Sequence, residues 1–342
     1  MSDSFAMARA RRALAEAGLD FQAPLQSASS VTNEVWLTDR YVIRVNRKPN
    51  QRLRREAFLG PLLPHEVGYP RIVGYGGELG ADWLIAERVP GNVLSRVWPT
   101  MSTVERRSAV RQLANILRHL HQVPCPDDLP EIDAAPQLLD ARAFRAVDPL
   151  LEALAEVAGF PNIEARLIEE AQAIVLDTSS VIEPFDQRTL VHGDLHFENV
   201  LWDGHVVTAL LDFEWARAAP RDLDLDVFLR FCAYPYLHVA EDYEQGTRAE
   251  DYVDVPYWMA EDYPELFSFP RQFDRMRLYC IAYDVRELLL YPPRRAPREL
   301  STHHPYNRLE RTVRGHSHLN RLAGDATSWA DGSPLPAPLA HQ

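Results

Sequence analysis

Apolar and polar positions divide the chain into a strand-rich first part and a helical second part. Residues 6–17 have helical spacing and end at Gly18, which suits a left-handed helix cap. Residues 51–63 are also helical and stop before Pro64. Short apolar runs that predict strands lie at residues 25, 35–37, 41–45, 71–75 and 83–88. The first part is therefore predicted to contain three strands, a helix and two further strands.

The boundary between the two parts is expected at residues 89–92, where Pro90 and Gly91 interrupt the pattern. Apolar residues recur with a helical period over residues 103–122, and the rest of the chain is predicted to be mainly helical. A short strand pair at 189–191 and 206–212 is the exception, and it flanks a polar loop. The predicted units are an N-terminal lobe at 1–89, a C-terminal lobe at 90–323 and a disordered tail at 324–342.

Composition narrows the class of protein. The net charge of −13 disfavours nucleic-acid binding, which depends on Lys and Arg. No apolar run approaches the roughly 20 residues that span a bilayer, and the N-terminus does not resemble a secretory signal. The three cysteines are far apart, which argues against a disulfide framework or a zinc site. We therefore expect a cytoplasmic protein that binds neither nucleic acid nor membrane, and the oligomeric state stays open.

The most informative stretch is residues 192–199, which read HGDLHFEN between two apolar runs. This pattern presents Asp194 and Asn199 on a loop at the end of a strand, and Asp212 follows the next apolar run. Phosphoryl transfer needs a carboxylate that accepts the proton of the attacking hydroxyl. It also needs oxygen ligands for Mg²⁺ beside the β- and γ-phosphates. These three residues supply such groups on two adjacent loops.

The same stretch resembles the signature of the aminoglycoside phosphotransferase and choline kinase branch of the protein-kinase-like fold. The resemblance implies a bilobal α+β fold, with an N-terminal five-stranded antiparallel sheet, one helix and a mainly helical C-terminal lobe. It implies that Asp194 is the catalytic base, that His192 supports the loop, and that Asn199 and Asp212 bind Mg²⁺. Glu214 is a candidate ligand for a second Mg²⁺, with an ordinary surface carboxylate as the alternative.

Downstream, residues 221–226 read RDLDLD and are similar to the start of the family's acidic helix. In that family an aspartate at this place holds the catalytic loop. Asp222 and Asp226 are the candidates for this structural support.

The nucleotide, ATP or GTP, is expected in the N-terminal lobe, although the glycine-rich motifs GxGxxG and GxxxxGK[ST] are absent. Residues 27–33 form a polar loop whose hydroxyls and amides are predicted to hold phosphates. A plain hairpin turn is the alternative. The candidate contacts in this loop are Ser29, Ser30 and Asn33.

In the third strand, the resemblance places the phosphate-binding cation at Arg44, whose fork of donors suits phosphate oxygens. Glu56 on the following helix is its expected ion-pair partner, and Lys48 is the fallback if Arg44 points to solvent. Residues 84–91 resemble the family's hinge. Backbone groups of Glu87 and Val89 are expected to bind the purine edge, without deciding between ATP and GTP.

Acidic and aromatic residues are interleaved between 241 and 265, where the family places substrate-binding helices. This composition suits a cationic acceptor, and a solvated acidic surface is the alternative. The candidate substrate contacts are Glu198, Asp251, Asp254, Tyr257 and Trp258. Conversely, the arginines at 294, 295 and 298 suit an acidic substrate.

These observations favour an enzyme that phosphorylates a hydroxyl of an aminoglycoside-like antibiotic, with a role in resistance. A kinase of another alcohol, such as a nucleoside or macrolide antibiotic, choline or a sugar, is the alternative within the same reaction class. A nucleotide-binding protein without transfer activity is the alternative from another class. The presence of Asp194, Asn199 and Asp212 together argues against it.

Overall fold

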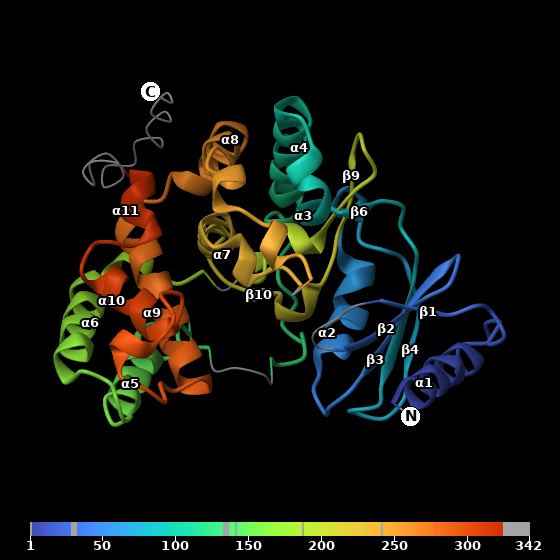
Figure 1. Ribbon diagram of the computed structural model, residues 1–342, viewed down its shortest axis with the longest axis horizontal. Helices are drawn as coiled ribbons and strands as arrows, with labels where there is room; N and C mark the ends of the chain where they lie inside the picture. The colour runs from blue at the N-terminus through green and yellow to red at the C-terminus, as the bar shows by residue number, and fades with distance from the viewer. Residues whose placement is uncertain are drawn as a thin grey trace.

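The structure is a computed structural model that describes residues 2–28, 33–132, 137–140, 142–186, 188–240 and 242–323. The expected contacts Ser29 and Ser30 and the expected disordered tail lie outside these residues. Two lobes stand side by side in Figure 1, a sheet with two helices on the right and a larger helical body on the left.

The N-terminal lobe is built on one antiparallel sheet with the strand order β1-β2-β3-β5-β4. Its elements are α1 (Ser2–Glu16), β1 (Gln26–Ala28), β2 (Asn33–Leu37), β3 (Tyr41–Asn46), α2 (Arg52–Leu59), β4 (Ile72–Gly76) and β5 (Trp83–Glu87). The predicted five-stranded antiparallel sheet, with a helix inserted after the third strand, is confirmed. Because β5 lies between β3 and β4, β3 is an interior strand and not an edge.

Alternation along β3 decides which side chains face each helix. Ile43 and Val45 are buried against α1, in a cluster that includes Leu14 and Trp36. Arg44, between them in sequence, points to the opposite face, where α2 packs on β4 and β5. The strand pattern alone thus directs Arg44 toward the side of the sheet that meets the second lobe.

The C-terminal lobe is mainly helical, as predicted. Its helices are α3 (Leu94–Val97), α4 (Thr103–Leu120), α5 (Asp148–Val157), α6 (Ala165–Thr178), α7 (Asp222–Ala233), α8 (Val255–Asp262), α9 (Gln272–Leu290), α10 (Pro305–Val313) and α11 (His318–Ala323). Helix α9 contacts α5, α6, α7, α10 and α11, so it is the central element of this lobe (Figure 1). No helix within the described ranges combines the length and apolarity that a membrane span requires.

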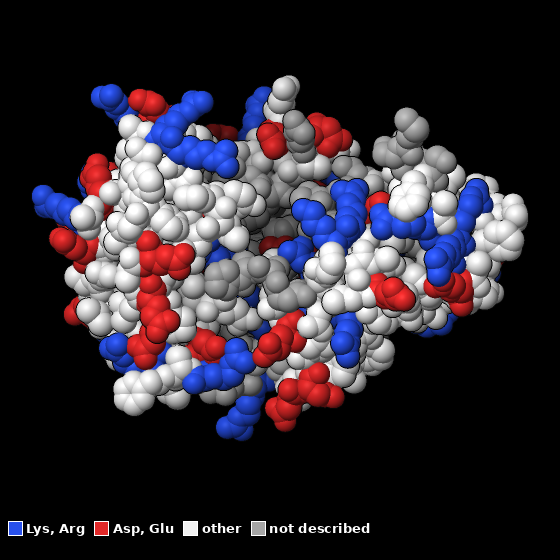
Figure 2. Space-filling view, turned by 90° about the horizontal axis from the view of Figure 1, so that it is seen from below, with Lys and Arg blue, Asp and Glu red and all other residues white. Residues whose placement is uncertain are grey.

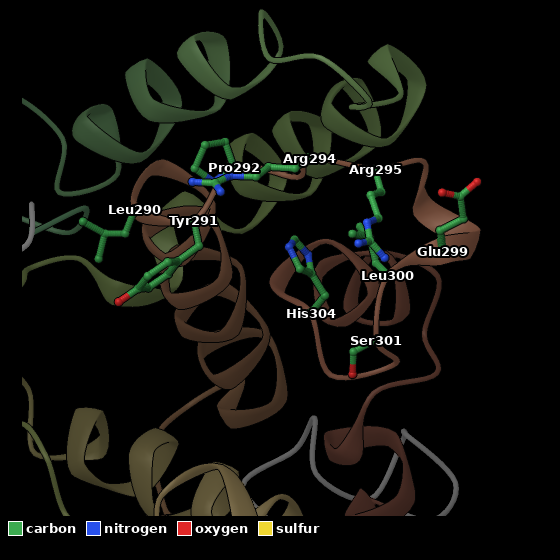
Figure 3. A pocket seen from close by; sticks show the side chains of 9 residues that line it. All are labelled: Leu290, Tyr291, Pro292, Arg294, Arg295, Glu299, Leu300, Ser301 and His304. Atoms are coloured by element: carbon green, nitrogen blue, oxygen red, sulfur yellow. The ribbon is translucent and has the colours of Figure 1, made fainter. Parts of the chain in front are cut away.

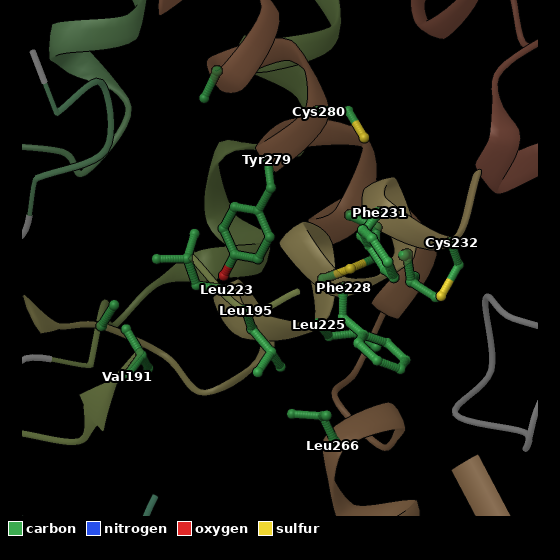
Figure 4. Close-up of a cluster of buried hydrophobic side chains, with 14 of the residues drawn as sticks. Val191, Leu195, Leu223, Leu225, Phe228, Phe231, Cys232, Leu266, Tyr279 and Cys280 are labelled. Atoms are coloured by element: carbon green, nitrogen blue, oxygen red, sulfur yellow. The ribbon is translucent and has the colours of Figure 1, made fainter. Parts of the chain in front are cut away.

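Helix α7 is buried along almost its whole length. Figure 4 shows Phe228 and Phe231 of α7 among Leu195 of the loop 192–199 and Tyr279 of α9. Buried aromatic side chains contribute large apolar areas to a core. The polar loop therefore rests on the most tightly packed part of the lobe.

The short strands around the polar loop differ from the expected pair. Strand β7 (Leu190–Val191) pairs with β10 (Arg217–Ala218), whereas β9 (Val207–Leu210) pairs with β8 (Val200–Trp202). Strand β8 also pairs with β6 (Asn92–Val93), directly after the interlobe connection. The expected strands exist but are not partners, because each runs beside a strand of only two or three residues that has no clear sequence pattern.

Candidate active site

Residues 192–199 connect β7 to β8, and we call them the catalytic loop after the role proposed for Asp194. The side chain of His192, the first residue of this loop, stabilises its backbone. The buried imidazole accepts a hydrogen bond at Nδ1 from the Asp194 backbone N–H, at 3.2 Å. Its Nε2 lies 2.8 Å from the Leu211 carbonyl. Because Nδ1 must accept, the ring carries its proton on Nε2 and donates it to Leu211. His192 thus has a supporting position and ties the catalytic loop to the segment that leads to Asp212.

Asp224 holds the backbone of the catalytic loop, which corrects the expectation of Asp222 or Asp226. Its carboxylate accepts hydrogen bonds from the N–H groups of His192 and Gly193, at 2.8 and 2.7 Å, and contacts His121 Nε2 at 3.0 Å. Residues 222 and 226 lie on the other face of α7, since residues four apart share one side of a helix. There Asp226 pairs with Arg230, one turn later on α7, and Asp222 pairs with Arg275 of α9.

Gly193 is required by the geometry of the loop. Its φ of +80° lies in the left-handed region, and a Cβ there would overlap the carbonyl oxygen of Trp215. The same Cβ would lie 3.1 Å from Arg217 Nη1. The guanidinium of Arg217 therefore packs directly against the backbone beside Asp194.

Asp194 is held ionised by its neighbours. Burial opposes the charge, but the attraction and the hydrogen bond of His196, whose Nε2 lies 3.3 Å from Oδ2, lower the pKa of Asp194 below its ordinary value. In turn, burial disfavours the charged form of His196, but Asp194 raises the pKa of His196 above its ordinary value. Its lowered pKa keeps Asp194 ionised. Because the side chain keeps 34% of its surface exposed, the carboxylate is also accessible.

Asn199 and Asp212 present oxygen atoms to the same region. The Asn199 amide nitrogen donates to the Asp194 carbonyl at 2.9 Å, so the amide oxygen is the atom left for a cation. The Leu211 N–H donates to the Asn199 carbonyl at 2.8 Å, which joins the two loops. Asp212 has φ +64°, a left-handed conformation that carries strain in a residue with a side chain. Such strain is typical of functional sites.

Three carboxylates, which we call the carboxylate cluster, surround Arg44: Glu56, Asp212 and Glu214. Arg44 forms an ion pair with Glu56, and its Nη2 lies 3.2 Å from Asp212 Oδ1 and 3.5 Å from Glu214 Oε2. The expected ion pair with Glu56 is thus present, and Arg52 adds a second cation 2.9 Å from Glu214 Oε1. Lys48, the fallback, is exposed.

The carboxylate cluster contains three carboxylates, whereas only two cations, Arg44 and Arg52, pair with them among the described residues. Burial and the neighbouring Asp212 raise the pKa of Glu214, even though Arg44 and Arg52 oppose the shift. Burial also raises the pKa of Glu56, against the attraction of Arg44. Glu56 is nevertheless well held, since it accepts hydrogen bonds from the Phe213 N–H and the Tyr69 hydroxyl at 2.9 and 3.2 Å.

The site has the donor chemistry for a hard cation. Glu214 Oε2 is buried without a hydrogen-bond donor, and Asp212 and Asn199 add further oxygens. Within the described part of the chain, no set of three or more Asp, Glu, His or Cys side chains forms a complete metal cage. Mg²⁺ does not need one, because it binds through one or two carboxylates together with substrate phosphates and water. These residues therefore fit a nucleotide-bound Mg²⁺.

At the expected hinge, the two candidate residues differ in their backbone hydrogen bonds. The Glu87 N–H donates to the Arg71 carbonyl at 2.9 Å, and the Glu87 carboxylate pairs with Arg71. Val89 has no hydrogen-bond partner for its N–H within the residues that the structure describes. Asn33, the described member of the expected phosphate loop, is buried at the start of β2 and pairs in register with Asn46.

A cavity of about 170 Å³, which we call the Asp194 cavity, opens beside the proposed base. Its walls come from the loop after β9, from β10, α7 and α9. The charged or polar residues around Asp194 in this cavity include Trp215, Arg217, Asp226, His238, Tyr283 and Arg286. These side chains surround Asp194 on the side of the cavity.

The residues predicted to bind substrate do not line the Asp194 cavity. Asp251 is paired with Arg106 of α4 at 3.2 Å, and α8, which contains Tyr257 and Trp258, packs against α4 (Figure 1). Asp254 precedes the first turn of α8. Asp251 is thus engaged by the protein itself, and the substrate contacts expected at Asp254, Tyr257 and Trp258 stay a prediction.

Glu198, another predicted substrate contact, is engaged by α3. Its carboxylate contacts the Ser95 hydroxyl and lies 3.4 Å from Arg96 Nη2, so it joins the catalytic loop to α3.

Comparison with known proteins agrees with this arrangement. The model of the Phosphotransferase enzyme family matches residues 20–258, which is more than half of the chain and includes the loop 192–199 and the carboxylate cluster. The chain belongs to the phosphotransferase enzyme family. Among curated family relatives, an aminoglycoside 3'-phosphotransferase of Streptomyces fradiae is 28% identical over 48% of this chain and 59% of its own length. One of Streptomyces ribosidificus is 29% identical over 49% and 61%. The chain thus spans about three fifths of the length of these relatives.

Solved structures share the fold. Aminoglycoside phosphotransferase APH(2'')-Ib with bound ADP has a TM-score of 0.57 at 15% identity, over 86% of this chain and 94% of its own. A mutant of aminoglycoside phosphotransferase APH(4)-Ia, in a ternary complex with AMP-PNP and hygromycin B, has a TM-score of 0.58 at 14% identity, over 91% and 97%. At this identity the likeness establishes the kinase-like architecture alone.

A second cavity, of about 360 Å³, lies at the C-terminal end of α9. Figure 3 shows Arg294, Arg295 and His304 among the side chains around it. None of its lining residues belongs to the catalytic loop or to the carboxylate cluster. The arginines that the sequence suggested for an acidic substrate are therefore not at the reacting centre.

Sequence reasoning missed Asp224, Arg52, Arg217 and Arg286. Asp224 stood in the RDLDLD stretch that was singled out, and the orientation of its helix would have identified it. Arg52 begins the same helix as Glu56, so its helical phase was a usable signal. Arg217 and Arg286 belong to β10 and α9, and no local pattern of the family links them.

Proposed function

We propose that this chain is a Mg²⁺-dependent small-molecule kinase that transfers the γ-phosphoryl group of ATP or GTP to a hydroxyl. The observation that carries the proposal is the joint placement of Asp194, Asn199 and the carboxylate cluster around one loop. A phosphotransferase needs a base for the acceptor, oxygen ligands for Mg²⁺ and a cation for the phosphates.

In the proposed reaction, Asp194 orients the acceptor hydroxyl and takes its proton. The hydroxyl oxygen forms the new bond to the γ-phosphorus. The bond from that phosphorus to the bridging oxygen breaks, and its electron pair leaves with the nucleoside diphosphate. His196 keeps Asp194 ionised and ready to accept. Because the transition state is loose, most of the catalysis comes from such positioning and charge.

Nucleotide binding is assigned to the carboxylate cluster and the hinge. Asn199 and Asp212 would hold Mg²⁺, with Glu214 beside them, and Mg²⁺ would neutralise charge on the β- and γ-phosphates. Arg44 would turn its guanidinium to the phosphates while Glu56 fixes its position. The Val89 N–H would donate to the purine edge. Ser29 and Ser30 remain candidates for further phosphate contacts.

The acceptor has two candidate classes. The relatives named aminoglycoside 3'-phosphotransferase favour an aminoglycoside-like antibiotic, and hence a role in resistance. The two arginines in the Asp194 cavity favour a different alcohol. A cytoplasmic location suits either class, because ATP and GTP are available there. The class without transfer activity is disfavoured, because a protein that only binds nucleotide does not need Asp194 in place.

The proposal is tested with a panel of hydroxylated compounds that includes aminoglycosides, sugars and hydroxy acids. Release of ADP and GDP is measured with Mg²⁺ and with excess EDTA, and ³¹P NMR identifies the phosphorylated product. We expect at least one acceptor to stimulate turnover, and EDTA to abolish it. Asp212→Asn is the matched variant, because it keeps the shape but removes the charged oxygen, so more Mg²⁺ should be needed.

Two results would contradict the kinase assignment. One is a protein that binds nucleotide but shows no Mg²⁺-dependent turnover with any acceptor and no slow Mg²⁺-dependent hydrolysis of the nucleotide by water. The other is an Asp212→Asn titration with Mg²⁺ that overlays that of the parent.

A further inference from the structure

Two arginines from distant parts of the chain meet in the Asp194 cavity. Arg217 comes from β10 and Arg286 from α9. The Arg286 guanidinium is 4.6 Å from the centroid of the Tyr283 ring and 5.7 Å from that of Trp215, so aromatic faces fix its position. Figure 2 shows a hollow between the larger lobe and the smaller lobe, with basic side chains beside it.

Neither arginine is well neutralised by the protein. Within the described residues, Arg217 has no carboxylate at ion-pair distance, and its hydrogen bond goes to the Trp215 carbonyl at 3.3 Å. Arg286 reaches Glu287 at 3.3 Å, and its Nε is buried without a hydrogen-bond partner. Arginines inside proteins are usually paired with carboxylates or phosphates.

The acidic groups of the Asp194 cavity are already engaged. Asp226 accepts a hydrogen bond from Arg230 at 2.7 Å and another from Cys280 at 3.3 Å. Asp194 interacts with His196. His238 adds no charge, because burial and the nearby His196 lower its pKa to about 3. The charge left without a partner in the Asp194 cavity is therefore positive.

The titration of Arg217 supports this count. Burial, followed by repulsion from Arg286, lowers its pKa to about 10, although Asp224 and Asp194 act in the opposite direction. An anion in the cavity would relieve the repulsion between the two guanidiniums.

We infer that the acceptor of this kinase carries an oxyanion, a carboxylate or a phosphate, which Arg217 and Arg286 bind while its hydroxyl faces Asp194. The inference rests on the proposed function and specifies its substrate class. A guanidinium matches an oxyanion with two parallel donors, which gives both affinity and orientation. A polycationic acceptor would instead bring ammonium groups toward Arg217, which has no carboxylate at ion-pair distance within the described residues, and toward Arg286 beside it. Like charges at an interface select against a partner.

The test measures binding to the full chain loaded with Mg²⁺ and the non-hydrolysable nucleotide AMP-PNP. The probes are gluconate, glucose 6-phosphate, glucose, glucosamine and kanamycin, which separate carboxylate, phosphate, neutral and cationic groups. Ligand-detected NMR titrations give the dissociation constants. The anionic probes should bind about tenfold or more tightly than glucose, glucosamine and kanamycin. The stronger anionic probe identifies the oxyanion.

The variant Arg217→Gln/Arg286→Gln should lose this preference, with the affinity for glucose unchanged. The matched control, Arg12→Gln/Arg166→Gln, removes the same charge from exposed positions on α1 and α6 and should behave like the parent. Arg286→Gln alone keeps the test valid if the double variant does not fold, and it should lose a part of the anion affinity.

Three results overturn the inference: no binding of either anionic probe, cationic probes that bind as tightly as the anionic ones, or an anion preference that survives in the variants. Hydrolysis of ATP and GTP by the same protein preparations, measured without AMP-PNP, separates this failure from that of the proposed function. Turnover without anion preference removes only the acceptor class. The absence of Mg²⁺-dependent turnover removes the kinase assignment itself.

Discussion

The two sides of the catalytic loop have opposite imbalances of charge. On the side of the N-terminal lobe, the carboxylate cluster exceeds Arg44 and Arg52, and the pKa of Glu214 is raised by burial and by Asp212. On the side of α9, Arg217 and Arg286 exceed the free acidic groups, and the pKa of Arg217 is lowered by burial and by Arg286. Each side thus lacks the charge that one ligand would supply.

In the proposed reaction, the contrast would separate two kinds of substrate. A Mg²⁺-bound nucleotide would complete the acidic side, and an anionic acceptor would complete the basic side. Asp194 lies between them, in the Asp194 cavity and on the same loop as Asn199. Because opposite potentials attract different ligands, they also discourage each substrate from binding on the wrong side.

The largest expected effect comes from the residue between the two sides. Asp194→Asn should lower turnover by about 10²–10⁴-fold, the usual contribution of a positioned acid or base. Fold and nucleotide affinity should stay close to those of the parent, because the side chain keeps its size. Steady-state kinetics and nucleotide titrations check both parts. Near-normal turnover would remove Asp194 from the role of base.

The acidic side is tested by a charge-balance cycle at Arg44 and Glu56. Arg44→Met should destabilise the fold by about 3 kcal/mol, because it leaves the buried Glu56 without its cation. The double variant Arg44→Met/Glu56→Gln removes both charges and keeps an acceptor for the Phe213 N–H, so part of the stability should return while nucleotide affinity stays low. Denaturant unfolding and nucleotide titration separate the two effects. Equal stability of the single and double variants would contradict a coupled pair.

The third prediction concerns Asp224, which holds the backbone of the catalytic loop. Asp224→Asn places an amide NH₂ against backbone donors of His192 and Gly193, which should cost about 1–3 kcal/mol of stability. Turnover should fall as well, because the loop that presents Asp194 loses its support. Asp222→Asn is the matched control, since its buried carboxylate pairs with Arg275 away from the loop. It should lose stability but keep the turnover of its folded fraction. Equal turnover of the two variants would contradict the role of Asp224.

These variants also mark how far sequence alone could go. The ion pair of Arg44 with Glu56, expected from the family resemblance, and the HGDLHFEN loop between two apolar runs both rest on short stretches of sequence, and the structure contains both. The prediction of Asp222 and Asp226 as the support of the loop was wrong, because the residue in this role, Asp224, is decided by which face of α7 meets the loop. That is a property of packing and not of spacing.

Charge pairing across long sequence distances was the other limit. The acidic residues at 251, 261 and 265 pair with Arg106, Arg107 and Arg118 of α4, roughly 150 positions earlier. A composition that suited a cationic substrate therefore forms a helix interface. Arg217 and Arg286 are likewise brought together only in the folded lobe, where β10 and the end of α9 line the same cavity.

The smallest expected effect concerns the His196–Asp194 pair at the border of the two sides. The folded pKa of His196 is raised, so its stabilisation is fully present below its unfolded pKa of about 6.5 and is lost as pH rises through the folded value. The folded pKa of Asp194 is lowered, so its contribution is present above about 3.9 and is lost as pH falls further. His196→Gln should therefore be less stable than the parent between about pH 4 and 6.5, by about 1 kcal/mol or less, because Asp194 is partly solvated. The difference should shrink at higher pH. Unfolding curves of both proteins across this pH range measure the difference in their free energies of unfolding. A difference that grows with rising pH would contradict an ion pair between His196 and Asp194.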